Sequence, residues 1–93
     1  MIRAFGCAKT KELFVSGKSR HFPAGVCKVG LRKLDYLHAA RRLGDLAKVP
    51  GNRLEALKGD YGGFYSIRIN DQYRIVFRFE DSGAHDVKIT DYH

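Results

Sequence analysis

Apolar residues in the first half of the chain recur with the period of a helix. Spacings of four and three residues place one set on a single helical face: Cys27, Leu31, Leu34 and Leu37. Pro23 is suited to the first turn of this helix, and Gly44 is its expected end. The basic residues of the segment fall largely off the apolar stripe: Lys28, Arg32, Lys33, Arg41 and Arg42.

A shorter helix and a strand are expected before this one. Thr10 is suited to cap the start of the shorter helix and Gly17 to end it, with apolar residues at positions 13–15 between them. Residues 2–5 are predicted to form a short first strand.

After Pro50 the period of the pattern changes from helical to two. Four strands are expected, over residues 53–58, 64–69, 73–80 and 85–92, with turns at 50–52 and 59–63. The predicted order β-α-α-β-β-β-β is an α+β fold, in which two helices cover the one apolar face of a small, mainly antiparallel sheet. No repeat or linker divides residues 1–93, so we expect a single domain.

Strand parity predicts the register of the sheet. A three-residue loop at 70–72 pairs Ile67 with Ile75 and keeps the apolar residues of both strands on one buried face. The same test on the last hairpin places Phe79 opposite Val87 and Phe77 opposite Ile89.

On the opposite face, these registers bring positive charges together. Arg68 falls opposite Arg74, and Arg74 falls opposite Tyr92. Arg78 falls opposite Lys88. Because like charges facing each other destabilise a sheet by up to about 1 kcal/mol, the pattern favours an anionic ligand on this face. The alternative is that the side chains splay into solvent, where the repulsion is screened.

Composition agrees with a globular protein that attracts polyanions. The chain is 44% hydrophobic and carries 17 basic against 10 acidic residues, a net charge of +7. Charge does not say which polyanion binds, and many small basic proteins bind none. Cys7 and Cys27 have no CxxC or metal-ligand spacing, and no apolar run is long enough to span a bilayer. We therefore expect a reduced, cytoplasmic protein without metal or other cofactor and without a membrane partner.

Three segments carry a resemblance to a known family. They are PGNRLEALKGD at residues 50–60, YSIRINDQYRIVF at 65–77 and VKITDYH at 87–93. These segments, in the last half of the chain, resemble HigB-type toxins of the RelE/ParE superfamily, found in type II toxin–antitoxin systems. The first half resembles the family in length and helix placement more than in motif.

The resemblance implies a RelE-like fold and an endoribonuclease, an mRNA interferase that cleaves mRNA in the A site of the translating ribosome. It also implies a HigA-type antitoxin with a helix-turn-helix, which contacts operator DNA and represses the operon in complex with the toxin. Asp91, Tyr92 and His93 match the acidic, aromatic and imidazole positions tied to cleavage. Lys58 and Arg74 match basic positions on the same surface.

A departure from the family pattern concerns Glu55, which stands where some members have a catalytic His. RNA is cut when its 2′-hydroxyl attacks the adjacent phosphate, which needs a base, an acid and positive charge. Either Glu55 or His93 is the candidate base, and each also has a structural reading: Glu55 in an ion pair with Arg53 or Lys58, His93 as a frayed end.

The other candidate residues would bind the message. Arg74 and Lys58 are expected to hold the scissile phosphate, and Arg53 and Arg68 to assist. Tyr92 is expected to stack on a base, or else to cover the core. Asp91 either takes part directly or orients His93 or an arginine. Arg78 and Lys88 extend the RNA-binding surface.

Two other classes of function remain open. A toxin of the same superfamily can poison DNA gyrase by protein contact, as ParE-type relatives do, but such a toxin needs no convergent phosphate site. A non-catalytic module that binds RNA or the ribosome would lose function gradually as charges are removed, whereas an enzyme would fail on loss of one or two residues.

Overall fold

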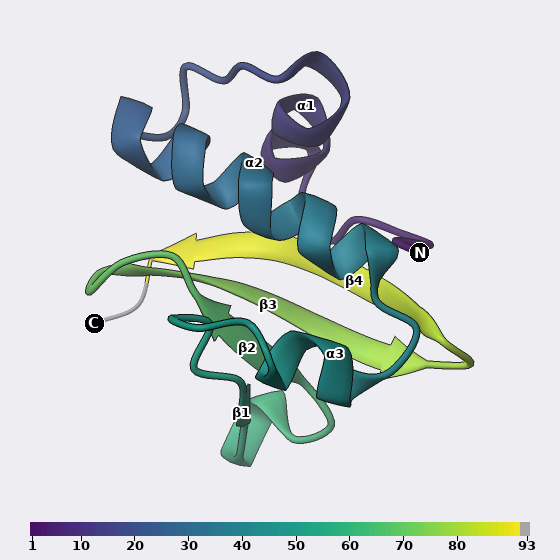
Figure 1. Cartoon of the computed structure of the whole chain (residues 1–93). Helices are drawn as coiled ribbons and strands as arrows, with labels where there is room; N and C mark the ends of the chain where they lie inside the picture. The colour runs from purple at the N-terminus through teal and green to yellow at the C-terminus, as the bar shows by residue number, and fades with distance from the viewer. Residues whose placement is uncertain (92–93) are drawn as a thin grey trace.

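The computed structural model describes residues 1–91, in which α1 and α2 cover one face of a four-stranded sheet (Figure 1). Strands run antiparallel in the order β1-β2-β3-β4. Helix α2 packs over β3 and β4, and α1 packs beside α2 over β4. The helices are α1 (Ala8–Ser16), α2 (Ala24–Ala39), α3 (Leu43–Ala47) and the 3-10 helix η1 (Gly59–Tyr61). The strands are β1 (Glu55–Ala56), β2 (Tyr65–Arg68), β3 (Tyr73–Glu80) and β4 (Gly83–Asp91).

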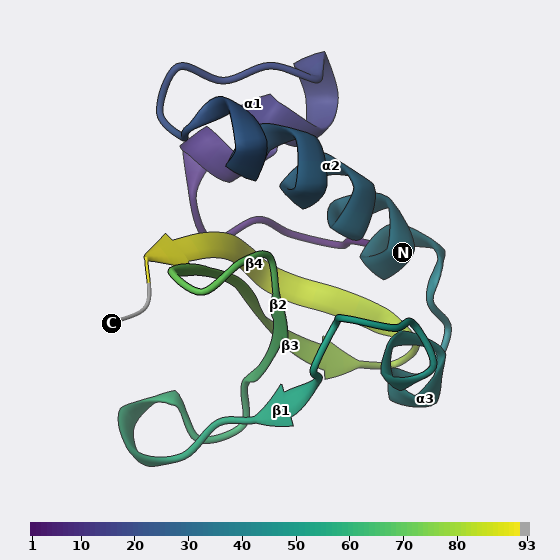
Figure 2. The same cartoon turned by 60° about the vertical axis from the view of Figure 1, so that its left-hand side comes forward.

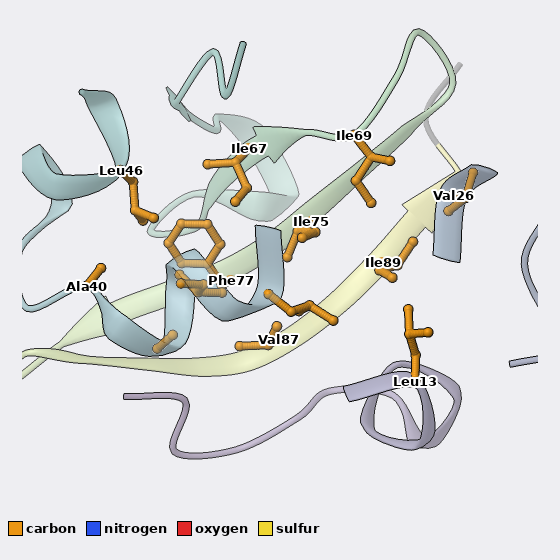
Figure 3. Close-up of a cluster of buried hydrophobic side chains, with 13 residues drawn as sticks. Leu13, Val26, Ala40, Leu46, Ile67, Ile69, Ile75, Phe77, Val87 and Ile89 are labelled. Carbon is orange, nitrogen blue, oxygen red and sulfur yellow. The ribbon is translucent and has the colours of Figure 1, made fainter. Parts of the chain in front are cut away.

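The core lies between the two main helices and the sheet, as the apolar pattern predicts (Figure 3). Leu13 from α1 and Leu34 and Leu37 from α2 are fully buried. They meet alternate residues of the strands, among them Ile67, Ile75, Phe77 and Val87. The α+β architecture with helices on one face of an antiparallel sheet is therefore confirmed.

The predicted register of the first long hairpin is also confirmed. Ile67 lies opposite Ile75, and Arg68 lies opposite Arg74. The loop uses the side chain of Asn70, whose Oδ1 accepts the backbone N–H groups of Gln72 at 2.9 Å and Tyr73 at 2.8 Å. This local bonding fixes a three-residue connection, which keeps the apolar residues of both strands on the core face.

The predicted register of the last hairpin is wrong. Asp81 and Ser82, with φ of 50° and 61°, form a two-residue turn of the kind that suits a tight hairpin. Asp86, at φ 53°, then adds an extra residue to β4. Phe79 consequently faces Ala84 instead of Val87, and Ile89 faces Ile75 instead of Phe77.

This correction also changes the predicted pairings of charged residues. Arg78 lies opposite His85 and not Lys88, which lies opposite Val76. Arg74 lies opposite Thr90, not Tyr92. Of the three predicted pairings, only that of Arg68 with Arg74 remains.

The predicted first strand forms only two isolated bridges, parallel to β4. Ile2 pairs with Ala84 and Phe5 with Val87. The backbone N–H of Arg3 donates to the carbonyl oxygen of Ala84 at 2.7 Å, and that of Gly6 to Val87 at 2.9 Å. The segment therefore lies along the outer edge of β4 without forming a continuous strand (Figure 2).

The helices differ from the prediction at three points. Helix α1 begins after Cys7, and Thr10 is a buried helical residue whose Oγ1 accepts the backbone N–H of Ile89. Its predicted end is confirmed, because Gly17 has φ 77° and donates its N–H to Leu13. Helix α2 ends at Ala39, before Gly44, which belongs to α3. Lys33, expected off the apolar stripe, is only 4% exposed.

Candidate active site

The sheet face that points away from α1 and α2 gathers the candidate residues. We call it the open face and define it by residues with the parity of Arg74 and their cross-strand partners: Glu55, Ser66, Arg68, Arg74, Val76, Arg78, Glu80, Gly83, His85, Lys88 and Thr90. One cross-strand row runs Glu55, Ser66, Val76 and Lys88, and a second runs Arg68, Arg74 and Thr90. Five of the predicted site residues are thus on one surface.

Arg74 is the most constrained cation of this face. Its Nε donates to the Ser66 hydroxyl at 2.7 Å, and its Nη2 donates to the backbone carbonyl of Arg53 at 2.7 Å. Its side chain is only 12% exposed. Both acceptors are neutral, so they orient the guanidinium without cancelling its charge. Within residues 1–91, its Nη1 has no hydrogen-bond partner.

Glu55 lies beside this guanidinium in a loose ion pair. Its Oε1 is 3.8 Å from Nη2 of Arg74, and its side chain is 57% exposed. The alternative partners considered for Glu55, Arg53 and Lys58, form no ion pair with it in the described part of the chain. An exposed carboxylate next to a fixed guanidinium can serve as a proton acceptor beside a bound phosphate.

Arg68 has a partner that relieves its repulsion with Arg74. Its guanidinium pairs with Asp71 in the connecting loop. It stays partly exposed, on the strand next to Arg74. Its backbone is also held, since its N–H donates to the carbonyl of Asn52 at 2.6 Å.

Lys88 and the segment around η1 approach each other over the open face. Nζ of Lys88 is 5.3 Å from the centre of the Tyr61 ring and 3.4 Å from its hydroxyl. A cation over an aromatic ring is attracted by the ring's electrons. Lys58 precedes η1 and is exposed, and the structure gives it no direct contact with Arg74.

Arg78 is placed differently from Arg74, although both project from β3 onto the open face. Its Nε donates to Asp86 at 2.8 Å and its Nη1 to Glu80 at 2.6 Å. The hydrogen bond that Arg78 donates to the Asp86 carboxylate, with the added charge of Glu80, raises the pKa of Arg78. It lies four positions further along β3 than Arg74, roughly 13 Å away.

Asp91 lies at the end of β4 with the opposite parity from Arg74. It pairs with Tyr73, and its Oδ2 accepts a hydrogen bond from the Gln72 amide at 3.1 Å. The open-face position opposite Arg74 is taken by Thr90. The other two residues of the predicted terminal motif, Tyr92 and His93, lie outside the described residues.

Two residues of this site were not predicted from the sequence, Ser66 and Tyr61. Ser66 was predicted only as part of a strand, yet its hydroxyl anchors Arg74. Its parity with Arg68 was the available signal, because a small hydroxyl between arginines on one face is a natural acceptor. Tyr61 was read as part of a turn, and no sequence signal pointed to its contact with Lys88.

The described part of the chain contains no candidate metal site. Among residues 1–91, no group of three or more His, Cys, Asp or Glu side chains is arranged to hold a metal ion. In the same residues, no helix has the length and apolar character needed to cross a membrane.

Comparison with known proteins identifies the family. The family model described as RelE-like toxin of type II toxin-antitoxin system HigB matches residues 4–93. Toxin HigB-1 of Vibrio cholerae is 41% identical over 78 residues, 82% of each chain. Endoribonuclease HigB of Proteus vulgaris is 31% identical over 93 residues, all of both chains.

The fold is shared with solved toxin structures. A chain of the YoeB-YefM complex from Staphylococcus aureus matches with a TM-score of 0.63 at 19% identity, covering 100% of this chain and 98% of that one. At this identity the match speaks for the fold alone. The sequence matches over nearly the whole length place this chain in the family of RelE-like toxins of the HigB type II toxin–antitoxin system.

Proposed function

We propose that this chain is an endoribonuclease that cleaves mRNA on the translating ribosome, in the cytoplasm, and thereby stops growth. One observation carries the proposal: the Arg74 guanidinium is fixed by two neutral acceptors, beside an exposed carboxylate, on a cationic sheet face. The printed name of the Proteus vulgaris relative, an endoribonuclease, supports the same activity.

The proposed chemistry is attack of a 2′-hydroxyl on the adjacent phosphate. The oxygen of the 2′-hydroxyl bonds to phosphorus as the bond to the 5′ oxygen breaks, which leaves a 2′,3′-cyclic phosphate and a 5′-hydroxyl. Arg74 is proposed to bind the phosphate oxygens through Nη1, where negative charge develops. Lys58, Arg53 and Arg68 add positive charge around it.

The proton-transfer groups are proposed from the same surface. Glu55, 3.8 Å from Arg74, is positioned to take the proton of a 2′-hydroxyl next to a phosphate on that arginine. His93 is the second candidate for base or acid. Tyr92 is proposed to stack on a base of the message. Asp91, at the end of β4, is proposed to orient this terminal segment.

Partners follow from the family and the charge. We propose that a helix-turn-helix antitoxin binds and inactivates the chain, and that operator DNA is contacted only through that complex. The ribosome is proposed to supply the aligned message, with Lys88 guiding the RNA strand by long-range attraction.

The test is cleavage of a short message on programmed ribosomes. The wild-type chain is expected to yield a 5′-hydroxyl and a 2′,3′-cyclic phosphate, and a message with one 2′-deoxyribose at the cleavage position is expected to remain intact. Cleavage of that substituted message would overturn the 2′-hydroxyl mechanism. Intact messages in growth-arrested cells would overturn the nuclease proposal and favour a toxin that acts by protein contact.

A further inference from the structure

Lys33 is a buried cation on the core side of the sheet. It lies on the inward face of α2, with Gly30, Leu34 and Leu37, and only 4% of its surface is exposed. Within the described residues it forms no ion pair with a carboxylate. Its Nζ instead donates to two backbone carbonyls, that of Gly51 at 3.1 Å and that of Arg68. A buried charge held only by carbonyl dipoles is costly, so its retention calls for a reason.

The electrostatic setting of Lys33 ties it to the open face. Burial lowers the pKa of its ammonium, and the positive charges of Arg32, Arg68 and Arg74 lower it further. Two of those arginines are the opposed pair of β2 and β3. Lys33 therefore lies near the candidate site, although it projects from the helical layer.

The two carbonyls that Lys33 binds belong to segments that meet beneath the site. Gly51 is in the turn before β1, and Arg68 is the last residue of β2. Between them, fully buried Asn52 accepts the N–H of Arg68 at 2.6 Å and donates its side-chain amide to Leu46 of α3 at 3.1 Å. The 50–52 turn is thus held from α2, α3 and β2 together.

This turn leads directly to the carbonyl that orients Arg74. The next residue, Arg53, has φ 46°, a conformation that costs a non-glycine residue of order 1 kcal/mol or more. Its carbonyl accepts Nη2 of Arg74 at 2.7 Å. A backbone in this region persists only when its surroundings fix it, and the preceding turn supplies that constraint.

We propose that Lys33 is a positioning residue for the nuclease site: by binding the Gly51 and Arg68 carbonyls, it holds the Arg53 carbonyl where it aligns Arg74. The proposal rests on the function proposed for Arg74. It also accounts for the buried charge, since an apolar side chain of the same length would pack there without satisfying either carbonyl.

The experiment compares Lys33→Met with Lys28→Met, which removes an exposed lysine from the same helix. The first readout is hydrogen exchange of the Arg74 Nε–H, observed by NMR and assigned by its disappearance in Arg74→Lys. Lys33→Met is expected to speed this exchange about tenfold or more, because the Arg53 carbonyl and Ser66 no longer hold the guanidinium together. Lys28→Met is expected to leave it unchanged.

The second readout is the single-turnover cleavage rate on programmed ribosomes. Lys33→Met is expected to lower this rate about tenfold while ribosome affinity stays within twofold. Val26→Ala, which truncates a buried residue of the same helix, controls for lost stability. It is expected to lower the melting temperature and keep the cleavage rate at a temperature where both proteins are folded.

The outcomes separate the two proposals. Unchanged Arg74 exchange and unchanged cleavage in Lys33→Met would overturn the positioning role. Full cleavage by Arg74→Ala would overturn the proposed function, and the exchange readout would still decide whether Lys33 aligns Arg74. If Lys33→Met does not fold, Lys33→Gln replaces it, because a neutral amide one bond shorter removes the charge and weakens the reach to both carbonyls. Wild-type exchange and cleavage in that variant would also overturn the positioning role.

Discussion

The two ends of β3 present the same residue type on the same face in opposite electrostatic states. Arg74 is bound by a hydroxyl and a backbone carbonyl, both neutral, with Glu55 at 3.8 Å as its only ion-pair partner within residues 1–91. Arg78 is bound by the carboxylates of Asp86 and Glu80 at 2.8 and 2.6 Å. The guanidinium of Arg74 is therefore oriented while its charge can still attract an anion. The guanidinium of Arg78 is oriented by carboxylates that neutralise its charge.

The difference shows that register alone does not identify a binding arginine. Strand parity places both arginines on the open face, but the acceptors around each decide whether it can still attract an anion. Neutral acceptors restrict rotamers at little electrostatic cost, so a phosphate gains a preorganised donor. Carboxylates restrict rotamers too, yet a phosphate would have to displace them.

The strongest test of the comparison is Arg74→Ala. Removing the oriented donor is expected to lower single-turnover cleavage by about 100- to 1,000-fold, the effect typical of losing one transition-state donor. The melting temperature is expected to fall moderately, because the substitution leaves the Ser66 hydroxyl and the Arg53 carbonyl without this partner but removes no core side chain. The measurement is cleavage of a ribosome-bound message beside a thermal unfolding curve. A variant that unfolds would show that Arg74 is needed for the fold.

A sharper test keeps Arg74 and removes one of its acceptors. Ser66→Ala deletes the hydroxyl that accepts Nε at 2.7 Å. A hydrogen bond to a charged group contributes about 1.5–3 kcal/mol, so a loss of about ten- to hundredfold in cleavage rate is expected. Ser66→Thr, which restores a hydroxyl, is the matched control and should recover part of the rate. Equal rates in all three proteins would mean that this anchor does not matter.

The comparison can also be reversed by freeing Arg78. Glu80→Gln combined with Asp86→Asn removes both carboxylates, and Asn tolerates the positive φ of position 86. Exposed ion pairs contribute little free energy, so a phosphate can compete once they are removed, and RNA affinity is expected to rise about two- to fivefold at low salt. The gain should shrink as salt is added. A fluorescence titration with single-stranded RNA at two salt concentrations measures it.

The smallest effect is expected from Arg78→Gln. Since both its carboxylate partners already neutralise this arginine, cleavage should stay within about twofold of wild type, and the melting temperature should change little. The same cleavage and unfolding assays apply. A loss as large as that of Arg74→Ala would show that neutralised arginines on this face still bind the message.

Sequence reasoning succeeded where local signals and burial agreed. The register of β2 with β3 follows from parity plus the Asn70 loop, and both are visible in the residues. The opposed pair Arg68 and Arg74, the starting point of the site, is therefore predictable from sequence.

Sequence reasoning failed where the structure depends on one backbone conformation or on partners that are distant in the sequence. Asp86 adopts a left-handed conformation without being glycine, so nothing in the pattern marks the bulge that shifts β4. Lys33 lies on the inward face of α2, but a lysine among leucines reads as solvent-facing unless its carbonyl partners are known. Those partners come from segments 18 and 35 residues away.

The site itself was predicted in part. Glu55 and Arg74 were chosen from the family pattern, and the structure brings them together, whereas Lys58, just before η1, makes no direct contact with Arg74. The hydrogen bond between Ser66 and Arg74 could be identified only from the three-dimensional structure, because it depends on the register of the strands and on the rotamer of Arg74. The roles of Tyr92 and His93 stay predictions.

The pairing of residues 2–5 with β4 has a consequence for how the toxin is made. Ile2 and Phe5 pair with Ala84 and Val87, and the Thr10 hydroxyl accepts the backbone N–H of Ile89. The first ten residues therefore contact residues that lie about eighty positions later in the sequence. Such distant contacts slow folding and delay it until most of the chain has been synthesised. In a chain that is being synthesised, this edge of the sheet therefore forms only after β4 has left the ribosome.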